Sequence, residues 1–160
     1  DKGVPVLGIV YVPVLDLLFY GAQGTGAWKI ANGVSTPIHV ASISAGQQQL
    51  RVVASRNHRG DLLDTWLAKA QQQFPQLELV SMGSSLKICL VAEGSADIYP
   101  RLALTSEWDT AAAQAVLEAA GGVLLDIAGA PYRYNCKDDL LNPFFYAIGD
   151  PCSDIIGLIW

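Results

Sequence analysis

The chain has 160 residues, of which 51% are hydrophobic and 16% are charged, and its mean hydropathy is +0.30. This composition excludes a disordered chain, and the length suits one domain or two small ones. Ten Lys and Arg residues against fifteen Asp and Glu residues give a net charge of −5, which disfavours a nucleic-acid polymer as partner.

The first 45 residues are predicted to form a β-meander. Runs rich in β-branched and aromatic residues occur at 4–14, 17–20, 27–30 and 37–40, and turns that include Gly21, Gly24 and Gly26 separate them. A stretch rich in Ser, Ala, Gly and Gln follows at residues 42–49. We therefore divide the chain into residues 1–45 and residues 46–160.

Strands and helices are predicted to alternate in residues 46–160. Helices are expected at 61–74, 84–92 and 108–120, with a last helix opening at Asp150-Pro151. Strands are expected at 50–54, 77–80, 96–99, 123–126 and 144–148. This order predicts an α/β (α+β) fold in which a β-meander precedes a layered α/β domain.

Two further properties bear on cellular location. Every apolar run is shorter than the roughly 18 residues of a membrane span, so we expect no transmembrane segment. The three cysteines, Cys89, Cys136 and Cys152, are odd in number and far apart, which fits neither a zinc site nor a disulfide scaffold. We therefore expect a cytoplasmic protein.

Asp109 is the first candidate functional residue. It lies three residues after Ser106 at the start of an expected helix, which is the spacing of a helix-capping pair. A carboxylate beside the free N–H groups of a helix start can also hold Mg²⁺ while those groups bind phosphate. The residues alone leave both roles open.

A second set of candidates carries hydroxyl groups or positive charge. Ser84 and Ser85 follow a strand and Gly83, as in anion-binding loops, although the P-loop spacing is absent and a plain helix cap is an equal alternative. Most of the basic candidates end a strand or start a helix, and together they could clamp one or two phosphates. These residues are Arg56, His58, Arg59, Lys87 and Arg101.

Several motifs together resemble a known family. The run Trp108-Asp109-Thr110 followed by Gly121-Gly122 is similar to a signature of the inositol monophosphatase superfamily. Residues 55–58, 83–94, 97–101 and 141–143 look like the CysQ-type 3'(2'),5'-bisphosphate nucleotidases in particular. The resemblance covers nearly the whole chain, and it implies the C-terminal portion of a layered αβαβα sugar-phosphatase-like fold.

The resemblance also implies an activity and a site. Members of this family hydrolyse adenosine 3',5'-bisphosphate to AMP and phosphate with Mg²⁺. By motif, Asp109 would be a catalytic metal ligand within the substrate site, and His58 would line the nucleotide site. The remaining motif residues would contact the nucleotide and its non-scissile phosphate; they are Ser84, Ser85, Lys87 and Arg101.

One departure from the family pattern matters. The motif Asp-Pro-x-Asp-Gly-Thr, which supplies two metal-binding carboxylates, and a further ligating glutamate are absent from this sequence. The only Met is Met82, and an apolar strand opens the chain. We therefore expect the C-terminal part of a longer enzyme, inactive by itself, with an uncovered strand edge at residues 4–20 that self-associates or is disordered.

Two alternatives remain open. One is a module that binds a nucleotide or phosphometabolite without hydrolysing it. The other is an inositol or sugar monophosphatase of the same superfamily. The combination of His58, Lys87 and Arg101 favours a ligand with a base and a second phosphate.

Overall fold

The computed structural model describes residues 1–54, 60–83 and 85–159. Its first sheet holds β1 (Leu7–Val12), β2 (Leu17–Ala22), β3 (Gly26–Ala31) and β4 (Val34–Ile38). Its second sheet holds β5 (Gln49–Ala54), β6 (Gln76–Ser81), β7 (Ile98–Arg101), β8 (Val123–Asp126) and β9 (Phe145–Ile148). The helices are α1 (Asp61–Gln73), α2 (Leu86–Ala92) and α3 (Ala111–Ala119), with short 3₁₀ segments η1 (Pro13–Leu15), η2 (Glu107–Asp109) and η3 (Asp154–Leu158).

The first sheet is the predicted β-meander. Its strands run antiparallel in the order β1-β2-β3-β4, with Val10 opposite Phe19 in the first pair. Asn32 and Gly33 both have positive φ, which lets the chain reverse between β3 and β4 in two residues. Each strand of this sheet therefore pairs with the strand that follows it in the sequence.

The second sheet is mixed, with strand order β6-β5-β7-β9-β8. Strand β5 is parallel to β6 and β7, whereas β9 is antiparallel to both β7 and β8. The carboxyl ends of β5, β6 and β7 consequently lie at one edge of the sheet. Helices α1 and α2 follow β5 and β6 in the chain, and the candidate residues Ser85 and Lys87 lie at the start of α2.

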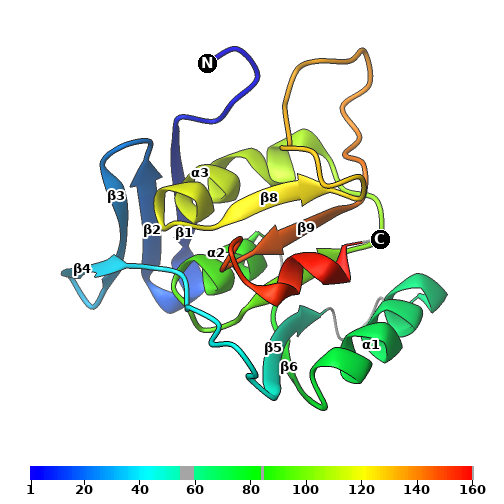
Figure 1. Cartoon of the computed structure of the whole chain (residues 1–160). Helices are drawn as coiled ribbons and strands as arrows, with labels where there is room; N and C mark the ends of the chain where they lie inside the picture. Colours follow the sequence, from blue (N-terminus) through cyan, green and yellow to red (C-terminus); the bar gives the residue numbers. More distant parts are fainter. Residues whose placement is uncertain (55–59, 84, 160) are drawn as a thin grey trace.

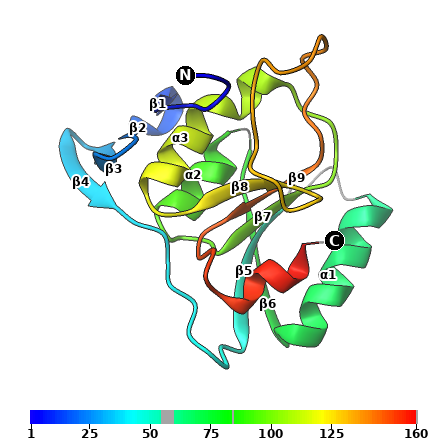
Figure 2. The same ribbon diagram turned by 45° about the horizontal axis from the view of Figure 1, so that its top comes forward.

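The elements form four layers (Figures 1 and 2). Helices α2 and α3 lie between the two sheets, and α1 with η3 covers the opposite face of the second sheet. One buried cluster joins the first sheet to α2, α3 and the inner face of the second sheet; the other lies under α1 and η3 and includes Trp66, Tyr146 and Ile155. The α/β (α+β) fold class is confirmed.

Helix α3 packs directly on glycines of the first sheet. A Cβ added to Gly8 would lie 1.9 Å from the carbonyl oxygen of Ala112, and one added to Gly21 would lie 2.9 Å from the Cβ of Ala119. Alanines on α3 and glycines on β1 and β2 thus allow backbone to approach backbone. A helix with larger residues on this face could not pack so closely.

The outer face of β1 is apolar and exposed. Strand β1 is an edge strand, and Leu7, Ile9 and Tyr11 are each more than half exposed on it. Residues 1–6 and β1 are described, so this segment is placed in the structure, whereas self-association stays a prediction. The division near residue 45 also stays a prediction, although one buried cluster crosses it.

Some predicted boundaries were wrong. The helix expected at 108–120 is divided into η2 and α3, because Thr110 leaves the helical conformation (φ −125°, ψ −35°). The helix expected from Asp150-Pro151 is the short 3₁₀ segment η3, which starts only at Asp154. Asp150 instead accepts hydrogen bonds from the backbone N–H groups of Ile43 and Cys152, which stabilises a turn there.

No helix within the described residues is long and apolar enough to cross a membrane.

Candidate active site

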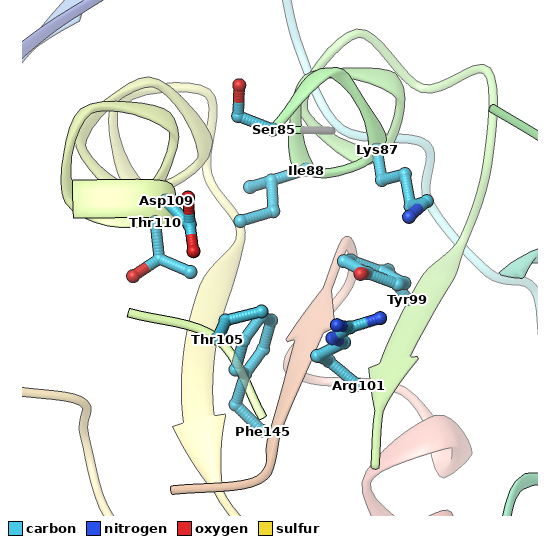
Figure 3. A pocket seen from close by; sticks show the side chains of 9 residues that line it. All are labelled: Ser85, Lys87, Ile88, Tyr99, Arg101, Thr105, Asp109, Thr110 and Phe145. Atoms are coloured by element: carbon cyan, nitrogen blue, oxygen red, sulfur yellow. The ribbon is translucent and has the colours of Figure 1, made fainter. Parts of the chain in front are cut away.

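A pocket of about 240 Å³ opens where β7, α2 and the start of α3 meet (Figure 3). It brings together four of the eight residues that the sequence singled out: Ser85, Lys87, Arg101 and Asp109. The other four lie outside the described residues; they are Arg56, His58, Arg59 and Ser84. Candidates that are up to 24 residues apart in the sequence thus line one pocket.

Lys87 enters the pocket from α2. All seven residues of this helix are buried, and Lys87 itself is only 6% exposed. Its Nζ lies 5.3 Å from the centroid of the Tyr99 ring, in a cation–π contact. Burial lowers the pKa of Lys87 below its ordinary value of 10.5, and the nearby charge of Arg101 lowers that pKa further.

The side chain of Lys87 has no acidic partner among the residues that the structure describes. A buried ammonium group needs a hydrogen-bond acceptor or a counterion, because desolvation of an unpaired charge is costly. The pocket in front of it can supply that counterion when it holds an anion.

Arg101 adds a second cation at the end of β7. Its Nη2 donates to the carbonyl oxygen of Leu104 at 3.0 Å. Its Nε is buried and has no hydrogen-bond partner within the described chain. Figure 3 shows the guanidinium group on the same side of the pocket as the Lys87 ammonium group. Two neighbouring cations with unused donors suit a phosphate group.

Asp109 faces these cations from the other side of the pocket (Figure 3). Its Oδ2 accepts the backbone N–H of Ser106 at 2.9 Å, so the capping role predicted from the spacing is confirmed. This hydrogen bond leaves Oδ1 available. Asp109 is exposed, and its carboxylate can still bind a cation or an N–H group of a ligand.

The described residues do not complete a metal site. Among the described residues there is no group of three or more His, Cys, Asp or Glu side chains that could hold a metal ion. Among the residues that the structure describes, Asp109 is the one carboxylate that lines the pocket. Since Mg²⁺ is bound through carboxylates, phosphates and water, Asp109 alone does not complete a site.

The sequence did not indicate every residue of the pocket. Its aromatic floor consists of Tyr99 and Phe145, whose rings meet edge to face at 5.8 Å. Thr105 and Thr110 lie on either side of Asp109 in the sequence and line the pocket with it, and Ile88 adds an apolar wall. The threonines could have been found from their place beside Asp109 in one motif, whereas Phe145 carries no such signal.

The fold and the site define a class of protein. Two sheets enclose a pair of helices, and a pocket with two cations opposite a carboxylate opens at the ends of strands, as in α/β proteins that bind phosphate-bearing small molecules. Residues 1–146 match the inositol monophosphatase family, and the chain belongs to that family.

Individual relatives agree with this assignment. The chain is 44% identical over 145 residues to the 3'(2'),5'-bisphosphate nucleotidase CysQ of Salmonella typhimurium and 43% identical to that of Escherichia coli K12, matching 91% of this chain and 55% of each relative. The crystal structure of CysQ from Bacteroides thetaiotaomicron superimposes with a TM-score of 0.82 at 42% identity, over 93% of this chain and 59% of that one.

The resemblance found in the motifs is therefore confirmed. The chain spans about half the length of the curated relatives it matches.

Proposed function

We propose that this chain forms the part of a Mg²⁺-dependent 3'(2'),5'-bisphosphate nucleotidase that binds the nucleotide and its non-scissile phosphate. The reaction is hydrolysis of adenosine 3',5'-bisphosphate to AMP and phosphate. The observation that carries the proposal is the buried ammonium group of Lys87, which faces the pocket beside Arg101 without an acidic partner in the described part of the chain. The named relatives support the choice of substrate class.

The pocket separates two kinds of binding group. Lys87 and Arg101 lie on one side and hold the phosphate that is not cleaved, because both offer donors that no described residue uses fully. Asp109 lies on the other side and serves as one ligand of the Mg²⁺ ion. Ser85 contributes a hydroxyl at the rim. A ligand with two phosphates uses both sides at once, whereas a monophosphate uses one.

The roles of His58 and Ser84 are part of the same proposal. Both are assigned by motif alone, to the nucleotide site and to phosphate contact, since they lie outside the described residues.

The metal supplies charge neutralisation and activation of water when it is bound. The described residues provide only Asp109 toward it, and the family's carboxylate motif is absent from the sequence. We therefore propose that this 160-residue chain alone binds the bisphosphate but does not hydrolyse it.

The test is a phosphate-release assay with adenosine 3',5'-bisphosphate, with and without Mg²⁺. It compares this chain with the natural full-length protein that contains its sequence. We expect Mg²⁺-dependent release by the full-length protein and none by the chain alone. Release of phosphate by the 160-residue chain would refute the proposal that this chain alone is inactive. Faster release from inositol monophosphate by the full-length protein would favour a monophosphatase, and no release from either substrate would favour a binding module.

We also propose a cytoplasmic location. Cys89, Cys136 and Cys152 are all free thiols, and the last two are exposed, which suits a reducing compartment.

A further inference from the structure

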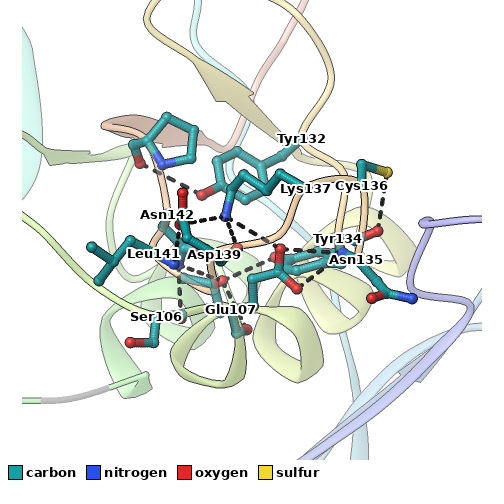
Figure 4. Close-up of polar contacts among 12 residues, drawn as sticks. Ser106, Glu107, Tyr132, Tyr134, Asn135, Cys136, Lys137, Asp139, Leu141 and Asn142 are labelled. Atoms are coloured by element: carbon teal, nitrogen blue, oxygen red, sulfur yellow. Dashed lines mark hydrogen bonds and ion pairs between the residues drawn. The ribbon is translucent and has the colours of Figure 1, made fainter.

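Residues 131–142, here named the clasp loop, lie along the segment that carries Asp109 (Figure 4). The backbone N–H of Glu107 donates to the carbonyl oxygen of Leu140 at 2.9 Å, and an isolated β-bridge joins Ser106 to Leu141. The carboxylate of Glu107 accepts the backbone N–H of Asn135 at 2.9 Å. These contacts join the middle and the C-terminal end of the clasp loop to Ser106 and Glu107, at the start of η2.

Asn142 of the clasp loop makes four hydrogen bonds to the segment that carries Asp109. It is 2% exposed, and its Nδ2 lies 2.8 Å from the carbonyl oxygen of Ser106 and 2.9 Å and 3.1 Å from the hydroxyl oxygens of Thr105 and Thr110. Its backbone N–H donates to the carbonyl oxygen of Thr105 at 2.8 Å. Every one of these acceptors belongs to the segment 105–110, which carries Asp109.

The contacts fix both peptide units that flank Ser106. The peptide group is planar, so holding the carbonyl group of Thr105 also fixes the direction of the Ser106 N–H. That N–H is the group that donates to Oδ2 of Asp109. The side chain of Asn142 holds the next peptide unit through the Ser106 carbonyl group. Asn142 therefore holds the peptide units on both sides of Ser106: its backbone N–H acts on the unit that donates to Asp109, and its side chain acts on the next unit.

Tyr134 supports the same segment from the far side. Its buried hydroxyl lies 3.0 Å from Oγ1 of Thr110 and 2.6 Å from Oε1 of Gln114. Burial raises the pKa of Tyr134, so this hydroxyl stays protonated and available for hydrogen bonding. Thr110 is thus held by Asn142 and Tyr134 together, directly after Asp109.

We propose that Asn142 is a positioning residue for Asp109, acting through the Ser106 peptide units, and that Tyr134 assists it through Thr110. The catalytic consequence rests on the function proposed above, whereas the positioning itself does not. A role in stability alone would not require all four contacts of Asn142 to reach one short segment.

The first experiment measures hydrogen exchange of the Asp109 and Thr110 amides in the 160-residue chain. The variants are Asn142→Ala and Asn142→Asp, which both remove the Nδ2 donors, with Ile155→Ala as a control. Ile155 is buried on the opposite face of the second sheet, so its truncation lowers stability without touching η2. Loss of about one to two hydrogen bonds predicts roughly tenfold or faster exchange at Asp109 and Thr110 in the Asn142 variants.

In the control variant Ile155→Ala, exchange of the Asp109 and Thr110 amides should rise only as much as exchange of the other amides in the chain. Equal changes at η2 and elsewhere in the Asn142 variants would overturn the proposal. If Asn142→Ala does not fold, Tyr134→Phe removes one hydroxyl at nearly constant shape and should raise exchange at Thr110 selectively; no selective rise there would also overturn it.

The second experiment measures phosphate release by the natural full-length protein with Asn142→Asp. We expect kcat to fall about tenfold with little change in KM for adenosine 3',5'-bisphosphate, because the hydrogen bonds of Asn142 reach the segment 105–110 that carries Asp109. A rise in KM at constant kcat would contradict positioning of Asp109. If the unsubstituted protein releases no phosphate, the proposed function fails, and the exchange data still decide the role of Asn142.

Discussion

The ammonium group of Lys87 lies over the ring of Tyr99, with Nζ 5.3 Å from the ring centroid. The ring face partly compensates for the water that this nearly buried cation has lost, but it offers no full counterion. Arg101 follows two residues after Tyr99 on β7 and brings a second positive charge to the same pocket. The structure therefore maintains two like charges that an anionic ligand would stabilise.

Replacing Lys87 should reduce selectivity for a second phosphate. In Lys87→Ala, affinity for adenosine 3',5'-bisphosphate should fall by about 10- to 100-fold, as expected for loss of a hydrogen bond between charged groups. Affinity for AMP should fall much less. Isothermal titration of both ligands measures the difference, with Lys69→Ala on α1 as a charge-matched control. Equal losses for the two ligands would remove the argument for two phosphate subsites.

The same lysine predicts a dependence of stability on pH. Because burial lowers its pKa in the folded state, the unfolded chain binds more protons between that lowered pKa and 10.5. Charged Lys87 thus costs stability at neutral pH, and this cost disappears as pH rises toward 10.5. Lys87→Met should therefore unfold at a higher denaturant concentration than the unsubstituted chain at pH 7. The difference between the two unfolding midpoints should narrow toward pH 10. A difference that widens with pH would contradict the lowered pKa.

Close packing of α3 on the first sheet predicts a large effect at one glycine. A methyl group on Gly8 would overlap the carbonyl oxygen of Ala112, so Gly8→Ala should lower the free energy of unfolding by about 1–3 kcal/mol or more. Gly60→Ala is the control, since a Cβ there would meet nothing within 4 Å. Gly60→Ala should lower the free energy of unfolding by less than about 1 kcal/mol. Denaturant unfolding measures both, and equal losses would show that α3 does not contact β1 so closely.

The exposed face of β1 predicts self-association of this chain. Leu7 and Ile9 point outward on an edge strand, which offers apolar surface and unpaired backbone groups together. Sedimentation should show species larger than the 17.1 kDa monomer, and the double variant Leu7→Lys, Ile9→Lys should sediment as the monomer. A monomer at every concentration for the unsubstituted chain would refute the prediction.

Much of the fold follows from local patterns in the sequence. A helix was predicted at residues 61–74 because apolar residues that include Leu63, Trp66 and Ala70 repeat at helical spacing, and α1 buries these three. The meander was predicted because its strands pair with sequence neighbours. By contrast, the last helix was predicted to open at Asp150-Pro151, whereas η3 starts at Asp154, because its position depends on contacts with distant residues, such as the hydrogen bond from Gln73 to the Asp154 carbonyl group.

The residues of the site that could be predicted are those whose charge and place in the sequence already indicate a function. Lys87, Arg101 and Asp109 were found because charged residues at strand ends and helix starts converge at one edge of a sheet. Phe145 was not assigned a role, since an aromatic residue in a strand looks ordinary until the fold places it; Asn142 belonged to a family-like motif at 141–143, but the motif alone did not indicate what its side chain does. Only the structure shows that Asn142 reaches three residues of the segment 105–110.

The location of the ligand site is tested most directly by amide chemical-shift changes, which map where adenosine 3',5'-bisphosphate binds on the 160-residue chain. We predict saturable changes at Ser85, Lys87, Arg101 and Asp109, which disappear in Lys87→Ala. The chain offers a second pocket of similar volume, lined by residues 43–48, 73–74 and 152–154. Changes confined to that second pocket, or no changes at all, would contradict the assignment of the site.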